Sequence, residues 1–147
     1  EIGGIVPFAA NTPPAEMAEP LLKGQVPWVF EIAGKMAHIN IAKTEVASLG
    51  SGLYRVKAWV ENSGYLPYPT AMGKRNSRIL PVIITLEGQN IKIIEGKKRS
   101  LVKSIGGHKS QEVTWLILAK KPVKVNIRAK TANAWADART IDLGGSR

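Results

Sequence analysis

The chain of 147 residues contains no cysteine, only two histidines and no long hydrophobic run. The missing cysteines exclude disulfides and thiolate chemistry, and they leave the redox compartment open. Without an apolar run of about 18 residues, no membrane-spanning helix is expected. The first residues also lack the basic start and the apolar core of a secretory signal. Because there is no initiator methionine, the chain is expected to be a piece of a longer protein.

Acidic residues are scarce as well, with 11 Asp and Glu against 21 Lys and Arg, giving a net charge of +10. The segment 1–31 is the exception, because it holds four glutamates and a single basic residue, Lys23. This asymmetry, together with a change of hydrophobic period, predicts two segments, 1–37 and 38–147. The positive field of the second segment would attract polyanions whatever its fold.

The first segment is predicted to be helical. Asn11-Thr12 followed by two prolines is a typical helix start, and a short helix is expected over Ala15–Leu22, limited by Pro20. Gly24 should break the chain before a second helix over Val26–Ala37. Apolar residues of that second helix, with Trp28 among them, fall on one face and need a partner surface.

From residue 38 onward the hydrophobic period changes to two, which is typical of half-buried strands. The clearest run predicts a core face of Tyr54, Val56, Ala58 and Val60, with Lys57 facing the other way. Eight strands are expected: His38–Val46, Leu53–Glu61, Ile79–Leu86, Ile91–Ile94, Ser100–Ile105, Gln111–Leu118, Val123–Ala129 and Ala138–Leu143. Short strands at this spacing predict a mainly β fold, an immunoglobulin-like β-sandwich preceded by a short helical segment.

The connection 62–78 is longer than most loops and carries two prolines and three basic residues. Two interpretations remain open for it: a solvated crossover between the sheets, or a functional and mobile segment.

Catalytic motifs are sparse. His38 and His108 lie seventy residues apart in the sequence, and neither is part of an HxxE or HExxH pattern. A zinc site usually needs three protein ligands, so each histidine is expected to be a surface residue, and neither a metal site nor a bound cofactor is expected. The acids show no evident pair for acid–base work, and there is no Gly-rich phosphate loop.

Basic residues cluster in turns, as in Lys97-Lys98-Arg99, and these turns should be solvent-exposed. Nucleic-acid binding usually combines basic residues with aromatic side chains on one face. Trp59, flanked by Arg55 and Lys57, is the single candidate for such a face. We expect Trp59 instead to pack on a neighbouring strand or on the first segment, so specific nucleic-acid binding is not expected.

The first segment resembles the end of the catalytic domain in zinc metallocarboxypeptidases of the carboxypeptidase A type. The resemblance rests on Glu1-Ile2-Gly3-Gly4, Pro7-Phe8, Asn11, Pro13-Pro14 and the helix around Trp28. The second segment is similar to the β-domain appended to many bacterial members. That similarity runs through residues 49–56 (LGSGLYRV) and 60–67 (VENSGYLP).

The resemblance implies that Glu1 is the general base that activates zinc-bound water in the longer enzyme. The family's zinc ligands, an HxxE pair and a distant histidine, are absent from this chain. By this reasoning the chain is a non-catalytic C-terminal fragment, with a β-sandwich that stabilises the peptidase or presents its substrate. Its implied partners are its own upstream catalytic domain and, through that domain, a peptide or protein substrate. Because such enzymes are commonly exported, a periplasmic or secreted location follows.

An alternative is a free-standing basic β-sandwich that binds anionic glycans or other polyanions, at least weakly. The sequence upstream would separate the two hypotheses, since an HxxE motif followed by a later histidine favours the peptidase.

Overall fold

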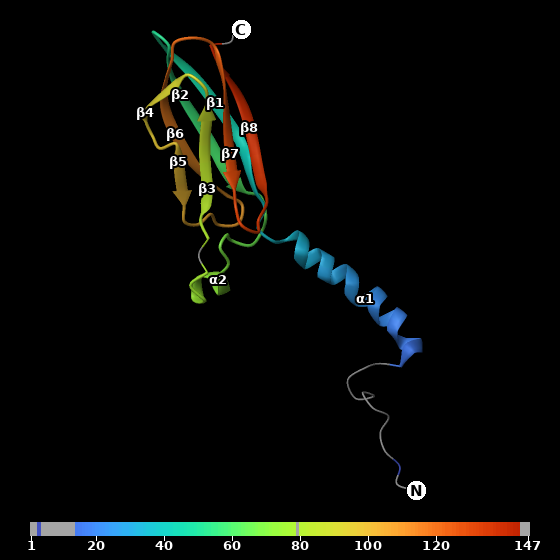
Figure 1. Ribbon diagram of the computed structural model, residues 1–147. Coiled ribbons are helices and arrows are strands. Elements are labelled where there is room, and N and C mark those ends of the chain that lie inside the picture. Colours follow the sequence, from blue (N-terminus) through green and yellow to red (C-terminus); the bar gives the residue numbers. More distant parts are fainter. Residues whose placement is uncertain (1–2, 4–13, 79, 145–147) are drawn as a thin grey trace. The chain divides into compact units, whose positions relative to one another are not determined.

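The computed structural model describes residues 3, 14–78 and 80–144. The chain divides into two compact units, Glu1–Lys35 and Met36–Arg147. The second unit contains a helix, α2 (Ala71–Arg75), and all the strands (Figure 1). The strands are β1 (Ile39–Gly50), β2 (Leu53–Asn62), β3 (Val82–Gly88), β4 (Ile91–Glu95), β5 (Arg99–Val102), β6 (Lys109–Ala119), β7 (Val123–Lys130) and β8 (Ala136–Leu143).

These strands form two antiparallel four-stranded sheets, ordered β1-β2-β6-β4 and β5-β3-β7-β8. The two sheets face each other as the layers of a β-sandwich (Figure 1). We call them the first and the second sheet. The mainly β fold predicted from the period-two pattern is therefore confirmed, and each of the eight predicted strands has an observed counterpart.

The core lies between the sheets and follows the predicted alternation. Val56, Ala58 and Val60 of β2 are fully buried, and Tyr54 packs partly buried against the same core. The second sheet contributes alternate residues of β3 and β7 in the same way, for example Ile84. The largest buried side chain is Trp115, whose indole N–H donates to the carbonyl of Lys97 at 2.9 Å. A buried indole needs such a partner, because an unpaired N–H would lose its hydrogen bond to water.

Most strand boundaries differ from the prediction by at most two residues, and three differ by more. The first of these three is the end of β1, which lies at Gly50 instead of Val46. Position 79, the predicted start of the third strand, lies outside the described residues, and β3 begins at Val82. Pro81 directly precedes it and has no N–H for a strand ladder. The predicted strand to Ile105 ends at Val102, and Ile105 instead forms an isolated bridge with Tyr68.

The loop 62–78 crosses from β2 in the first sheet to β3 in the second, as one interpretation expected. It is more structured than a solvated connection, because Tyr68 and Pro69 are buried. The hydroxyl of Thr70 accepts a hydrogen bond from the amide of Gly73 and caps α2.

The described residues of the first unit form one helix, α1 (Ala15–Gly34), so the prediction of two helices separated at Gly24 is wrong. Pro20 and Pro27 lie inside it, two turns apart and next to Glu16 and Lys23 on the polar side. Water there can hydrogen-bond the carbonyl groups that each proline leaves without an amide donor. None of the helices in the described residues has the length and the apolar character needed to cross a membrane.

Candidate functional site

Glu1, the general base implied by the family resemblance, lies outside the described residues. Within residues 14–78 and 80–144, no group of three or more His, Cys, Asp or Glu side chains could hold a metal ion. The residues of the β-sandwich therefore do not fit a zinc site.

The structure nevertheless brings the two histidines to one end of the sandwich. The carbonyl of His38 accepts from the amide of Ser63 at 2.9 Å, and the amide of His108 donates to the carbonyl of Gly64 at 3.2 Å. A Cβ on Gly64 would overlap the carbonyl oxygen of Met36, so only glycine fits this close approach. We call this end, formed by residues 36–38, 62–69, 105–108 and 131–135, the basal end.

Each histidine at the basal end contacts an exposed aromatic ring. His38 stacks on Trp135 with ring centroids 4.9 Å apart, and His108 meets Tyr65 edge-on at 5.8 Å. Trp135 is 67% exposed and has a φ of 72°, a conformation that is rare for a bulky residue. Both histidines are exposed. These pairs could not be predicted from the sequence, because the two partners of each pair come from different turns.

Asn62 organises the basal end and is fully buried. Its side-chain oxygen accepts from the amides of His38 at 3.0 Å and of Gly64 at 3.1 Å. Its side-chain nitrogen donates to the carbonyls of Leu66 at 2.8 Å and of Ile105 at 3.5 Å. The sequence held a signal for this role, because position 62 continues the inward-facing series 54, 56, 58, 60. A polar residue at a core-facing strand end needs buried partners.

A pocket of about 320 Å³ opens at the basal end beside the loop 62–78. Most of its lining is apolar, and Thr70, Arg78 and Asn133 add polar groups. Tyr68 also lines it, and the Tyr68 hydroxyl has no hydrogen-bond partner among the described residues.

Trp59, the sequence candidate for a nucleic-acid face, lies on the outer face of the first sheet. Its ring lies beneath the ammonium groups of Lys43, 5.4 Å from the centroid, and of Lys57, at 5.9 Å. Lys43 is the residue opposite Trp59 on β1, so the indole is packed on a neighbouring strand. This is the packing alternative raised from the sequence.

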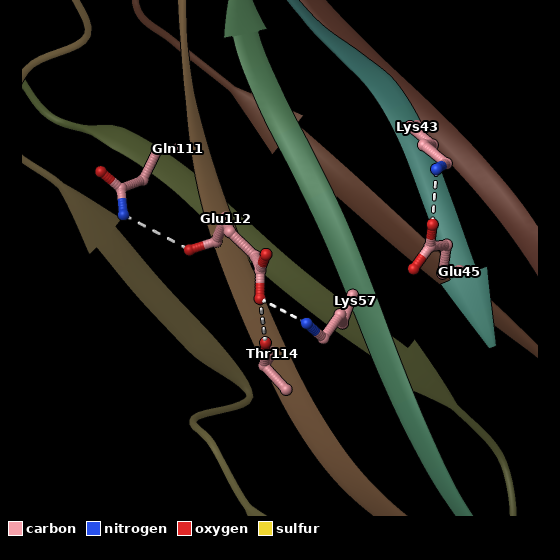
Figure 2. A network of polar contacts seen from close by, with 6 residues as sticks. All are labelled: Lys43, Glu45, Lys57, Gln111, Glu112 and Thr114. Carbon is pink, nitrogen blue, oxygen red and sulfur yellow. Dashed lines mark hydrogen bonds and ion pairs between the residues drawn. The ribbon is translucent and has the colours of Figure 1, made fainter. Parts of the chain in front are cut away.

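The lysines around Trp59 are paired with acids (Figure 2). The Lys57 ammonium lies 3.1 Å from the carboxylate of Glu112, which also accepts from the hydroxyl of Thr114 at 3.1 Å. The hydrogen bond from Lys57 is the main cause that lowers the pKa of Glu112 below its ordinary value. The fold thus favours the Glu112 carboxylate, and this stabilisation is lost as pH falls through the lowered pKa.

The outer face of the second sheet has a different charge pattern. Arg99 on β5 and Arg128 on β7 both lie opposite Thr85 of β3, and Lys130 follows two residues along β7. Within the described part of the chain, none of these three basic residues is in an ion pair. A groove of about 620 Å³ lies at one end of this sheet and is lined by Glu87, Gly88, Gln89, Lys98, Val123, Lys124, Asn126 and Thr140.

Residues 38–142 match the model of a family described as "Domain of unknown function (DUF8731)". The chain belongs to this family. The matched region begins one residue before β1 and ends inside β8, so the β-sandwich is the family's domain.

A search of curated proteins gives no match. Among solved structures, the chain is similar to the archaellum periplasmic stator protein FlaG from Sulfolobus acidocaldarius. The sequence identity is 11%, the TM-score is 0.36, and the match covers 72% of this chain and 100% of that chain. A likeness at this level carries no argument about function.

Proposed function

We propose that the chain is the C-terminal portion of a metallocarboxypeptidase-like protein, in which the β-sandwich is a non-catalytic accessory domain. In this proposal α1 belongs to the upstream catalytic domain. The sandwich stabilises that domain or presents its peptide substrate. The sequence resemblance of residues 1–37 motivates the proposal, and the properties of α1 support it.

The supporting observation is the apolar surface of α1. None of its residues is buried, and Trp28 and Phe30 are 64% and 71% exposed. At 100° per residue, its exposed apolar side chains spread over more than half of the helix circumference. They are Met17, Leu21, Leu22, Val26, Trp28, Val29, Phe30 and Ile32. An apolar arc of this width is typical of a helix that is buried in a larger domain.

The sandwich is suited to an accessory role because it has its own continuous core. The core cluster draws on both sheets and on the loop residue Tyr68. A unit of this size is large enough to fold independently. An accessory domain is required only to pack and to bind, so the proposal assigns no chemistry to the sandwich.

The experiment is to sequence the gene upstream of codon 1 and to assay its longest product on peptides with free C-termini. We expect an HxxE motif and a later histidine upstream, and release of C-terminal amino acids by the product. Replacing Glu1 by Gln in that product should lower turnover by about 10²-fold or more, the usual contribution of a general base. The isolated chain should release none.

An upstream sequence without those motifs would contradict the proposal. Near-normal turnover of the Glu1→Gln variant would remove the role of Glu1 alone and leave the accessory role of the sandwich in place.

The alternative function, a basic module that binds polyanions, is favoured by one observation. On its outer face the second sheet carries Arg99, Arg128 and Lys130 in register, and none of them is in an ion pair with another described residue.

A further inference from the structure

The two outer faces of the sandwich differ in charge although both are built from alternating strands. The outer face of the first sheet is balanced. Its charged residues are Lys43, Arg55, Lys57 and Lys92 with Glu45, Glu61, Glu95 and Glu112. On this face Lys43 pairs with Glu45, and Lys57 pairs with Glu112.

The outer face of the second sheet has an excess of basic residues. Its charged residues are Arg99, Lys124, Arg128 and Lys130 with Glu87 and Asp142. The two acids lie at the groove end of the sheet. Glu87 is opposite Asn126 and Asp142 is opposite Lys124, and both Asn126 and Lys124 line the groove. No acid lies among Arg99, Arg128 and Lys130 in the strand register. A surplus confined to one of two equivalent faces is not explained by the net charge of the chain.

The basic residues form a row rather than a scattered set. Arg99 and Arg128 flank Thr85 at a separation of about 10 Å, two strand spacings. Lys130 follows Arg128 at about 7 Å along β7, and Lys124 lies at the groove end of the same strand. From Lys124 to Lys130 the row extends for about 20 Å.

We propose that this face binds a linear acidic polysaccharide, which lies along β7 from the groove to Lys130. The guanidinium groups of Arg99 and Arg128 would bind its carboxylate or sulfate groups. Arginine suits these planar or branched anions because its donors form a fork that can bind two oxygens at once.

The side chains between the cations favour a polysaccharide over other polyanions. Thr85, Asn126 and Thr140 offer hydroxyl and amide groups that can hydrogen-bond sugar hydroxyls. Asn126 also lines the groove, together with Thr140.

Other polyanions fit this face less well. No aromatic side chain lies among the outward residues of β3, β5, β7 and β8, so a single-stranded nucleic acid would find no stacking platform. Among the large aliphatic side chains of these four strands, only Leu101 is exposed. One such side chain offers little apolar surface for insertion into a membrane. This inference does not depend on the carboxypeptidase proposal, because it uses only residues of the β-sandwich.

The test measures binding of two probes to the full chain, a sulfated heparin oligosaccharide and a carboxylated polygalacturonate oligomer. The double variant Arg99→Gln/Arg128→Gln should raise the dissociation constant by about tenfold or more. Each substitution removes a charge-assisted hydrogen bond between a guanidinium group and an acidic group of the sugar. The matched control, Arg55→Gln/Lys92→Gln, removes the same charge from the outer face of the first sheet and should change it less than about twofold. The two probes distinguish sulfate from carboxylate recognition.

Equal weakening by both double variants would overturn the proposal, because the attraction would then follow net charge alone. Failure of both oligosaccharides to bind would also overturn it, as would tighter binding of a single-stranded oligonucleotide or of phosphatidylserine vesicles. Amide shift changes in the unmodified protein give a readout that needs no variant. They should centre on β3, β5 and β7, and changes centred on β1 and β2 would contradict the assignment.

Discussion

At the scale of single residues, the alternation along β2 places neighbouring side chains in opposite environments. Val56 is fully buried between the sheets, whereas Lys57 points outward and pairs with Glu112. The register also places Glu45 opposite Lys57 on β1. An acidic substitution at position 57 would therefore add repulsion from two carboxylates, and glutamine is the better control.

Replacing Val56 by Asp should destabilise the sandwich by about 3–5 kcal/mol, because it leaves an unpaired charge in the core. Lys57→Gln should cost less than about 1 kcal/mol, as is usual for an exposed ion pair. Urea unfolding of both variants measures the difference. Lys57→Gln should also raise the pKa of Glu112 back toward its ordinary value, since the hydrogen bond that chiefly lowers this pKa is removed. Similar losses of stability in both variants would show that the strand faces are wrongly assigned.

At the scale of elements, the basal end depends on one buried amide. Asn62 joins the start of β1, the loop 62–78 and the segment at Ile105 through four hydrogen bonds. Ser63, its neighbour, also bonds to His38 but is exposed, with its hydroxyl 3.3 Å from the carbonyl. The two positions form a matched pair that differs in burial.

Asn62→Ala should lower the free energy of unfolding by about 2–4 kcal/mol, because it leaves buried amides and carbonyls without partners. Ser63→Ala should change it by less than about 0.5 kcal/mol, since water replaces an exposed hydroxyl. Hydrogen exchange adds a local readout, because the amides of His38 and Gly64 should lose protection in the Asn62 variant alone. Unchanged exchange at both amides would contradict the role of Asn62.

The strands could be predicted from the sequence because a period of two reports directly which side chains face the core. The helical segment was less predictable. Pro20 and Gly24 argue locally for a break, yet α1 continues through both. The penalty of each proline is reduced because it faces the polar side of the helix, which local propensity does not reveal.

The sequence could not predict which residues gather at the basal end or in the basic row. His38 and His108 form backbone hydrogen bonds to the adjacent residues Ser63 and Gly64. They lie there only because β1 and β6 both neighbour β2. Arg99 and Arg128 flank Thr85 because β5 and β7 both pair with β3, an order that follows from how the chain crosses between sheets. Strand order depends on long-range packing, whereas the period is a local property.

At the scale of the whole molecule, the two units differ in how they satisfy their apolar side chains. The sandwich buries a core of its own, whereas the apolar residues of α1 are exposed. Exposed apolar arcs of this kind are protein–protein contacts or association liabilities. The stability of the sandwich and the association state of the chain should therefore depend on different segments.

A shortened chain of residues 36–147 should have a melting temperature within about 2 °C of that of the full chain. The reason is that residues 36–147 contain every residue of the core cluster. The full chain should self-associate with rising concentration, and the shortened chain should stay monomeric in sedimentation experiments. In the full chain, Trp28→Ser combined with Phe30→Ser should reduce this association without changing the melting temperature, since both side chains are exposed. A shortened chain that melts more than about 10 °C lower would show that residues 1–35 stabilise the sandwich. The two segments would then form one cooperative unit, and the assignment of α1 to a separate catalytic domain would be contradicted.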